Sequence, residues 1–402
     1  MKKYDTYKDS GIQWIGQVPE HWATFPLSKY ITLQKGRKPD EFTTEGDLPY
    51  VTMDYLRGRE NTTCQYPVSV ENLIPIDEND LLLLWDGANA GEVVKAKQGY
   101  LASTMAVLKF ADKIGSTQFL FYYLKSLEAI FKTFANGTTI PHFDSLVLFD
   151  YKYPLPPLSE QEAIANFLDK KTGEIDQAIA LFEQEKSDLQ AYRKAIISET
   201  VTKGLNPNAK LKDSGIQWIG QIPEEWSVVK MKYCFEDIYS GESIRAEELD
   251  EDGKYPVYGG GAIISHANKY NVCAGDIIIG RVGANCGCVT YLTQNSWATD
   301  NALVVKSAID SRYLFHQLIA ADLNSLNSSN AQPLITASKV KDVKIACPKS
   351  ISDQKEIAEY IDKKTSDIDT AIERINTQIV DLQAYRTALI SEAVTGKIDV
   401  RL

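Results

Sequence analysis

The sequence predicts an α+β protein: two mixed α/β globular domains separated by a long antiparallel two-helix coiled coil, with an internal duplication and pseudo-twofold symmetry. Three observations indicate this fold class. Apolar residues recur at seven-residue spacing in two long stretches, a short aromatic segment occurs twice, and strand-like apolar runs lie at matching places in both halves. A chain of 402 residues, 44% of them hydrophobic, is long enough for two to three domains with sizeable cores.

The heptad pattern predicts two long helices with a coiled-coil seam. The seam residues are Leu168, Ile175, Phe182, Leu189 and Ile196 in the first copy, and Ile361, Ile368, Ile375, Leu382 and Leu389 in the second, 193 positions later. One apolar column is too little to stabilise each helix alone in water. We therefore expect the two copies to bury their seams against each other, and an antiparallel pair places one globular domain at each end.

The ends of both helices carry recognisable signals. Prolines precede the first helix, Ser159 and Glu162 have the spacing of a capping box, and Gly204 follows the last turn. The second helix is expected to begin near Ser352 and to end near Gly396. Each helix would then have about 43 residues and a length of roughly 65 Å.

The duplication extends beyond the helices. Lys8–Trp22 returns with two changes as Lys212–Trp226, and the globular parts share glycines at fixed places. The matching glycines are Gly36 with Gly241, and Gly87-Ala-Asn-Ala-Gly91 with Gly283-Ala-Asn-Cys-Gly287. We therefore divide the chain into residues 1–153 (first globular domain with its lead-in), 154–205 (first helical region), 206–346 (second globular domain with its lead-in) and 347–402 (second helical region).

Both globular domains are expected to be mixed. Runs rich in apolar and β-branched residues, bounded by Gly, Asn and Asp, predict strands, and two amphipathic stretches predict helices. The predicted strands are Leu81–Trp85, Val93–Lys97, Ala106–Phe110, Ile277–Ile279, Val289–Leu292 and Leu303–Lys306, and the predicted helices are Thr117–Lys132 and Ser311–Leu323.

Composition favours a cytoplasmic protein. The N-terminal residues contain no apolar run of the kind found in signal peptides, and no stretch of about 18 apolar residues predicts a membrane span. The six cysteines fit a reducing compartment. The net charge of −11 argues at first sight against nucleic acid as a partner. However, residues 160–202 and 353–395 each hold nine acidic and five basic residues, so the globular domains are nearly neutral and can hold basic patches.

No motif predicts catalysis by this chain. The sequence has no phosphate-binding loop, no dinucleotide-binding fingerprint and no Asn/Asp-Pro-Pro-Tyr motif of adenine methyltransferases. A zinc site is a second possibility to weigh, since His266, Cys273, Cys286 and Cys288 offer four ligands. Their spacing matches no zinc ribbon or finger, and the first copy has Ala90 where Cys286 stands, so we interpret them as free cysteines. We expect no metal site.

Nucleic acid is the remaining class of ligand, because Arg and Lys neutralise phosphates and Arg, Asn and Gln pair with base edges. The candidate DNA-binding residues of the first domain are Lys35, Arg37, Lys38, Arg57, Arg59, Thr139 and His142, with Asn89 and Thr138 as further polar groups. Those of the second domain are Arg245, Tyr258, Arg281, Asn330 and Gln332, with Asn285 as a further polar group. Asn89 and Asn285 match between the copies, so we expect them to hold the shared frame rather than to read sequence.

Three motifs resemble the specificity subunits of type I restriction–modification systems. They are Trp14-Ile-Gly-Gln-Val-Pro-Glu-His-Trp22 with its second copy, Pro154-Leu-Pro-Pro-Leu-Ser-Glu-Gln161 ahead of Asp169-Lys-Lys-Thr172, and Gly280-Arg-Val-Gly-Ala-Asn-Cys-Gly287 with Trp297-Ala-Thr-Asp-Asn-Ala302. The resemblance covers essentially the whole chain. It departs at the second helix start, where Cys347-Pro-Lys-Ser-Ile replaces the proline cluster.

The resemblance implies a non-catalytic, sequence-specific subunit that binds double-stranded DNA. In this family each of two target-recognition domains reads half of a bipartite asymmetric sequence, and the helical regions bind two methyltransferase subunits. Restriction subunits join for cleavage. S-adenosylmethionine, ATP and magnesium are then expected on the partner subunits, with no cofactor on this chain and no membrane partner.

Two interpretations from other classes stay open at this point. One is a protein-binding scaffold without DNA recognition, which a gel-shift test with DNA distinguishes. The other is a self-sufficient enzyme, which methyl transfer by the isolated chain with S-adenosylmethionine would reveal.

Overall fold

The computed structural model describes residues 2–58, 64–111, 115–133, 142–144, 152–326 and 334–401. The chain divides into two compact units: unit 1 is Met1–Leu181 with Thr377–Leu402, and unit 2 is Phe182–Asn376. Each unit thus holds one globular part and about half of each long helix. Within the described residues, no helix is both long and apolar enough to cross a membrane.

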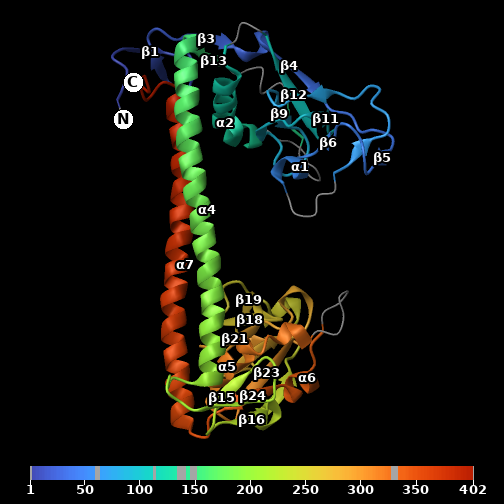
Figure 1. The fold of residues 1–402 in the computed structure, drawn as a ribbon, viewed down its shortest axis with the longest axis vertical. Helices are drawn as coiled ribbons and strands as arrows, with labels where there is room; N and C mark the ends of the chain where they lie inside the picture. The colour runs from blue at the N-terminus through green and yellow to red at the C-terminus, as the bar shows by residue number, and fades with distance from the viewer. Residues whose placement is uncertain are drawn as a thin grey trace. The chain divides into compact units, whose positions relative to one another are not determined.

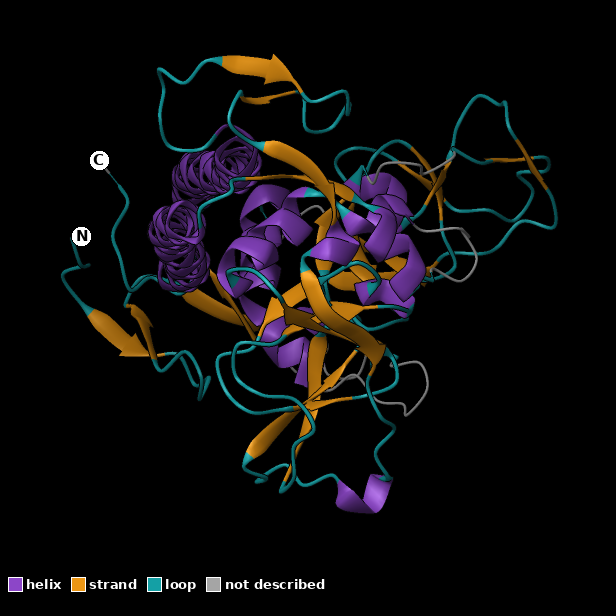
Figure 2. Cartoon of the chain, turned by 90° about the horizontal axis from the view of Figure 1, so that it is seen from below, coloured by secondary structure: helices purple, strands orange, loops and turns teal. Residues whose placement is uncertain are grey.

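The two long helices are α4 (Leu158–Lys203, 46 residues) and α7 (Ile351–Val394, 44 residues). In unit 1 the first half of α4 lies antiparallel beside the end of α7, and in unit 2 the end of α4 lies beside the first half of α7 (Figures 1 and 2). The predicted antiparallel coiled coil is therefore confirmed. Every seam residue is shielded from solvent: Leu168, Ile175, Ile361, Ile368, Ile375 and Leu389 are buried, and Phe182, Leu189, Ile196 and Leu382 are half-buried.

Coiled-coil helices usually carry two columns of apolar residues, and here polar residues take several positions of the second column. Arg193 Nε lies 2.9 Å from Asp369 Oδ1 in unit 2, and Arg386 Nε lies 3.2 Å from Asp176 Oδ1 in unit 1. The two ion pairs are copies of each other at the 193-residue offset. Buried Thr172 donates to the carbonyl oxygen of Leu168 one turn earlier (2.8 Å), and Thr365 donates to that of Ile361 (2.9 Å), so neither hydroxyl is left without a partner.

The predicted capping box at Ser159 is wrong. Helix α4 begins at Leu158, because the carbonyl oxygen of Pro157 already accepts from the backbone N–H groups of Glu160 (2.9 Å) and Gln161 (3.0 Å). Ser159 therefore lies inside the first turn and is exposed. The buried amide of Gln161 instead donates to the carbonyl oxygen of Pro156 at 2.9 Å.

Two sheets form the core of the globular part of unit 1 together with helix α2 (Thr117–Thr133). An antiparallel four-stranded sheet has the order β10-β9-β12-β4, and a three-stranded sheet has the order β6-β11-β8 with β6 and β11 parallel. The strands and helices are β1 (Tyr7–Asp9), β2 (Gln17–Pro19), β3 (Ala23–Pro26), η1 (Leu27–Lys29), β4 (Ile31–Lys35), β5 (Phe42–Thr43), β6 (Tyr50–Val51), α1 (Met53–Arg57), β7 (Tyr66–Pro67), β8 (Pro75–Ile76), β9 (Leu81–Leu84), β10 (Val93–Lys95), β11 (Gly99–Leu101), β12 (Met105–Phe110), α2 (Thr117–Thr133) and β13 (Lys152–Leu155).

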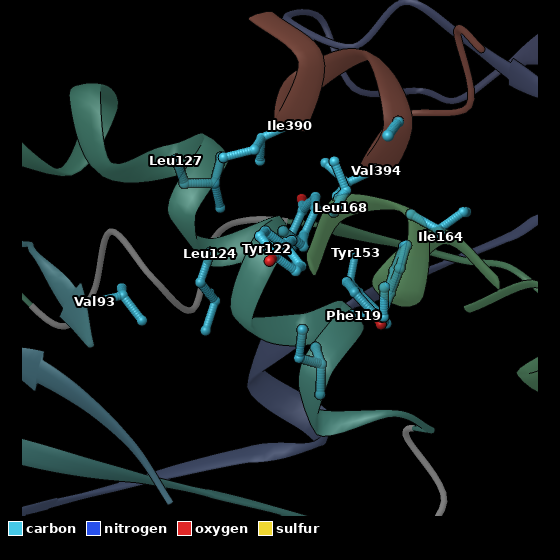
Figure 3. Packing of buried hydrophobic residues seen from close by; sticks show 14 of the residues in the cluster. Val93, Phe119, Tyr122, Leu124, Leu127, Tyr153, Ile164, Leu168, Ile390 and Val394 are labelled. Atoms are coloured by element: carbon cyan, nitrogen blue, oxygen red, sulfur yellow. The ribbon is translucent and has the colours of Figure 1, made fainter. Parts of the chain in front are cut away.

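The continuous apolar runs of β9 and β12 place apolar side chains on both faces of the four-stranded sheet, as expected for strands that are buried on two sides. Leu81 and Leu83 pack with α2, whereas Leu82 and Leu84 pack with the three-stranded sheet. The core on the α2 side continues to the long helices, where Tyr122 and Leu127 of α2 pack with Leu168 of α4 and with Ile390 and Val394 of α7 (Figure 3). Burial of this shared core fixes the globular part on the helix pair.

Unit 2 repeats this arrangement, which confirms the internal duplication. Its four-stranded sheet has the order β17-β23-β20-β21, matching β4-β12-β9-β10 of unit 1, and α5 packs on the corresponding face. The elements are β14 (Leu211–Asp213), β15 (Gln221–Pro223), β16 (Ser227–Lys230), η2 (Met231–Tyr233), β17 (Phe235–Ser240), η3 (Ala246–Glu248), β18 (Tyr255–Gly259), β19 (Ala262–Ala267), β20 (Ile277–Gly280), η4 (Gly283–Asn285), β21 (Val289–Tyr291), β22 (Trp297–Ala298), β23 (Ala302–Ser307), α5 (Ser311–Ala320), η5 (Leu323–Leu326), α6 (Ala337–Asp342) and β24 (Lys344–Cys347). All six predicted strands and both predicted helices of the globular parts are confirmed.

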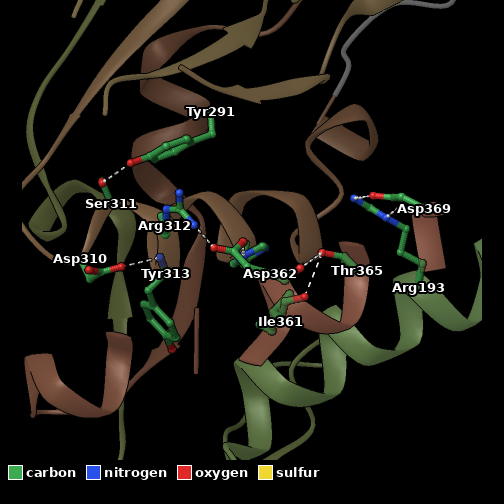
Figure 4. Close-up of polar contacts among 11 residues, drawn as sticks. Arg193, Tyr291, Asp310, Ser311, Arg312, Tyr313, Ile361, Asp362, Thr365 and Asp369 are labelled. Atoms are coloured by element: carbon green, nitrogen blue, oxygen red, sulfur yellow. Dashed lines mark hydrogen bonds and ion pairs between the residues drawn. The ribbon is translucent and has the colours of Figure 1, made fainter. Parts of the chain in front are cut away.

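A duplicated aspartate attaches each globular helix to its long helix. In unit 1, Asp169 accepts from the hydroxyl of Tyr122 at 2.7 Å. In unit 2, the equivalent Asp362 pairs with Arg312 (Figure 4). Its Oδ1 also lies 2.9 Å from Nε2 of buried His316. The Asp-Lys-Lys-Thr repeat thus marks the docking position of α2 and α5.

The matching glycines Gly36 and Gly241 are explained by a close backbone approach. A Cβ atom at Gly36 would lie 2.1 Å from the carbonyl oxygen of Ala102, and one at Gly241 would lie 2.3 Å from that of Ala298. No side chain fits at such distances. The glycines therefore fix where the outer strands β4 and β17 end.

Candidate nucleic-acid interface

Unit 1 gathers four polar and aromatic side chains just beyond the ends of β4 and β9. Lys35 Nζ lies 3.1 Å from Asp86 Oδ2 and 5.3 Å from the centre of the Trp85 ring. His142 Nδ1 lies 2.6 Å from Asp86 Oδ1, and the backbones of these two residues form an isolated β-bridge. We call Lys35, Trp85, Asp86 and His142 the Lys35 cluster.

Asp86 is the centre of the Lys35 cluster, which is partly open to solvent. Burial raises the pKa of Asp86, but hydrogen bonds from His142 and Lys35 outweigh it and hold the pKa below its ordinary value. The side chains of Lys35 and His142 remain 43% and 59% exposed. Both can therefore reach a ligand while Asp86 holds them in place. The structure thus brings together Lys35 and His142, two candidates that are distant in the sequence.

The other described candidates of unit 1 differ in their availability. Arg37 and Lys38 are exposed and make no ion pair with any described residue, so they are free to contact phosphates. Arg57, at the end of α1, is instead paired with Glu92. Asn89 is exposed, and its carbonyl oxygen accepts from the backbone N–H of Glu92 at 3.1 Å, which closes the turn between β9 and β10.

Four candidates lie outside the described residues. They are Arg59 and Thr139 of the first domain and Asn330 and Gln332 of the second, and Thr138 lies outside as well.

Unit 2 has a cationic cluster at the equivalent place. Arg281 Nη1 donates to Ser240 Oγ at 2.9 Å, while its Nε is enclosed and finds no acceptor among the described residues. The backbone of the next residue, Val282, forms an isolated β-bridge with Leu334. We call Ser240, Arg281, Val282 and Leu334 the Arg281 cluster.

The two clusters occupy the same positions of the duplicated frame. Lys35 and Ser240 directly precede the matching Gly36 and Gly241. Trp85 and Arg281 each stand two residues before the first glycine of the Gly-Ala-Asn-x-Gly turn.

The isolated bridges correspond too, since Asp86 pairs with His142 where Val282 pairs with Leu334. The cation of unit 1, Lys35, is the last residue of the edge strand β4. The cation of unit 2, Arg281, directly follows the inner strand β20. Sequence reasoning missed Trp85, Asp86, Ser240 and Leu334. Trp85, Asp86 and Ser240 could have been found, because they stand one or two residues before glycines that match between the two copies.

The remaining candidates of unit 2 lie on separate elements. Tyr258 is half-buried on β18, and burial raises its pKa above the ordinary value. Arg245 precedes η3 and is 81% exposed, with a contact of 3.4 Å to Glu247. Asn285 is half-buried, and its carbonyl oxygen accepts from the backbone N–H of Cys288 at 3.1 Å, as Asn89 does in unit 1.

The cysteines considered for zinc do not gather in the described part of the chain. Cys286 is buried and donates to the carbonyl oxygen of Arg281 at 3.3 Å, whereas Cys273 and Cys288 are exposed. No group of three His, Cys, Asp or Glu residues suited to a metal ion exists among the described residues. A cavity of about 460 Å³ in unit 2 lies at Trp226 and Ile357, beside the lead-in, and contains none of the candidate residues.

Comparisons with known proteins agree on one family. The model described as "Type I restriction modification DNA specificity domain" matches residues 19–189 and 223–380. The chain is 31% identical to the type I restriction enzyme MjaVIII specificity subunit of Methanocaldococcus jannaschii, over 96% of this chain and 95% of that protein. It is 28% identical to the type I restriction enzyme EcoprrI specificity subunit of Escherichia coli, over 89% and 93%.

A solved structure shares the fold. It is titled "Structural basis underlying complex assembly and conformational transition of the type I R-M system" and matches with a TM-score of 0.70 at 15% identity, covering 95% of this chain and 99% of the other.

Proposed function

Because the chain belongs to the type I restriction modification DNA specificity family, we propose that it selects the DNA sequence on which a restriction–modification complex acts. Each unit reads one half of a bipartite asymmetric target in double-stranded DNA. The chain is non-catalytic and directs methylation and cleavage by partner subunits.

The observation that carries this proposal is the pair of clusters at equivalent places with different chemistry. The Lys35 cluster offers an ammonium group and an imidazole held by a carboxylate, and the Arg281 cluster offers a guanidinium group held by a serine hydroxyl. Lys and Arg recognise guanine O6 and N7 in the major groove, and the neighbouring groups decide which further bases fit. Two units with the same backbone arrangement but different contacting side chains are suited to two different half-sites.

Phosphate contacts hold the units on the duplex. Arg37 and Lys38 serve this role in unit 1, and Arg245 serves it in unit 2, because all three are exposed. The acidic long helices face away from phosphate, toward protein or solvent.

The partners are two methyltransferase subunits and restriction subunits. Two copies of one lead-in, Lys8–Trp22 and Lys212–Trp226, give the chain two similar surfaces, and two identical subunits can use such surfaces in the same way. S-adenosylmethionine, ATP and magnesium bind those partners.

Co-expression with the methyltransferase subunits, followed by sequencing of the methylated motif, tests the proposal. Lys35→Ala should relax or change one half of the motif and Arg281→Ala the other, each by about 1–3 kcal/mol of base discrimination. Lys109→Ala is a matched control, because Lys109 is also on the sheet of unit 1, is 46% exposed and is paired with Asp80. Absence of a defined motif, or a change in both halves from either variant, contradicts the proposal.

A further inference from the structure

The β18–β19 hairpin of unit 2 exposes two adjacent isoleucines. Ile263 is 53% exposed and Ile264 is 57% exposed, although both belong to a strand of the three-stranded sheet. A large aliphatic pair on the surface of a folded unit costs hydration free energy and marks a contact site more often than scattered single residues do.

A β-bulge produces this exposure. The register shifts between Val257 and Tyr258, so Ile263 and Ile264 together face Tyr258 on the neighbouring strand. Ile264 lies over Gly259, where a Cβ atom would come within 2.8 Å of its Cγ2. Bulges re-aim side chains and recur beside functional sites.

The turn of this hairpin packs against the loop that carries Arg281. A Cβ atom at Gly260 would lie 3.6 Å from the carbonyl oxygen of Val282, and Thr290 Oγ1 donates to the carbonyl oxygen of Gly261 at 3.2 Å. The isoleucine pair therefore belongs to a hairpin whose turn contacts the loop of Arg281, and Leu334 of the Arg281 cluster is itself 37% exposed. Figure 1 shows β18 and β19 side by side, with β21 near them.

Among the described residues of unit 1, no such hairpin follows β6. Its third strand, β8, pairs with β11 on the side opposite to β6, whereas β19 pairs with β18, the counterpart of β6. Beside its cation, unit 1 presents Asp86 and His142. Lys35 thus has a carboxylate and an imidazole beside it in unit 1, whereas in unit 2 Arg281 is held by the Ser240 hydroxyl and the exposed isoleucine pair lies on the adjoining hairpin.

We propose that Ile263 and Ile264 contact the C5-methyl groups of thymines in the half-site that unit 2 reads. This inference rests on the proposed function and names the bases that unit 2 selects. In the major groove thymine is the base that presents a methyl group, and apolar side chains recognise it, while Arg281 is suited to a neighbouring guanine. A protein partner on the same patch is the alternative that the experiment distinguishes.

Replacement of each thymine of the target by deoxyuridine tests this, because the exchange removes only the methyl group. With the assembled complex of the chain and its methyltransferase subunits, deoxyuridine at one or two positions of the unit 2 half-site should weaken binding about fourfold per methyl group. In the Ile263→Ser/Ile264→Ser variant the same exchange should have no effect. Val68→Ser is the matched control, since Val68 is an aliphatic residue of unit 1 with 59% exposure, and it should keep the full deoxyuridine effect.

Four results overturn the inference. The first is specific binding that no deoxyuridine weakens, and the second is a deoxyuridine effect that persists in the serine variant. The third is a unit 2 half-site without thymine. The fourth is loss of the methyltransferase subunits on purification of the serine variant with the deoxyuridine effect unchanged, which assigns the patch to protein. A complex without any sequence preference refutes the proposed function as well, so the two failures are distinguishable.

Discussion

Asp362→Ala should destabilise unit 2 at the junction of α5 and α7, because it removes the hydrogen-bond partner of a buried histidine. The side chain of His316 is only 3% exposed, its Nε2 lies 2.9 Å from Asp362 Oδ1, and its Nδ1 has no partner among the described residues. Loss of the carboxylate leaves a buried ring nitrogen without a hydrogen bond, which costs about 1–3 kcal/mol. The half-exposed Arg312 pair adds at most about 1 kcal/mol.

The duplication supplies an internal comparison. In unit 1, Asp169→Ala removes the partner of Tyr122, but the Tyr122 hydroxyl keeps a hydrogen bond of 3.1 Å to Thr172. The cost should therefore be smaller, about 1 kcal/mol. Urea unfolding of the purified variants measures both, with Lys363→Ala as the control because Lys363 is exposed next to Asp362. If Asp362→Ala is no more destabilising than Lys363→Ala, this account of the docking of α5 is refuted.

Three further predictions concern pH, salt and helix length. Burial lowers the pKa of His316 below 6.5, although its hydrogen bond to Asp362 opposes this shift. The unfolded chain therefore binds this proton more readily, and the free energy of unfolding should fall as the pH drops below 6.5. His316→Gln should flatten this pH dependence in urea titrations. Arg57→Ala should weaken DNA binding and reduce the salt slope by about one unit, whereas Glu92→Ala, which releases Arg57, should strengthen binding; unchanged affinity and slope would show that α1 does not touch DNA. Insertion of seven residues after both Glu185 and Gln378 lengthens each helix by about 10 Å and should widen the spacer of the methylated motif by about three base pairs; an active variant with an unchanged spacer would contradict the idea that the helices set the spacing.

The long helices were predictable because burial of one helix face repeats every seven residues. The same periodicity did not explain why Arg193 and Arg386 stand at positions facing the partner helix. Each arginine pairs with an aspartate of the other long helix, Asp369 or Asp176. The start of α4 was misplaced by two residues, because the carbonyl oxygen of Pro157 accepts the first helical hydrogen bonds where the sequence predicted Ser159 as the N-cap. Local sequence signals thus identified the elements better than their ends.

The candidate site was only partly predictable. Lys35 and His142 were named separately, and nothing local joins them, since both pair with Asp86 and His142 reaches it through an isolated β-bridge. The pairing of Arg57 with Glu92 is equally long-range. The bulge that exposes Ile264 depends on its register with β18, which no periodicity encodes. Contacts between distant segments are set by tertiary packing, so the sequence named individual residues without their groupings.

Exchange of one globular part tests the central claim most directly. Ala23–Tyr153 should be replaced by the equivalent segment of a family member with a different target, which leaves the lead-in Lys8–Trp22 and both long helices in place. The exchanged chain is then co-expressed with its methyltransferase subunits, and the methylated motif is sequenced. If each unit reads its own half-site independently, one half of the methylated motif should change, while the other half and the spacer stay the same. A change in both halves would contradict the account.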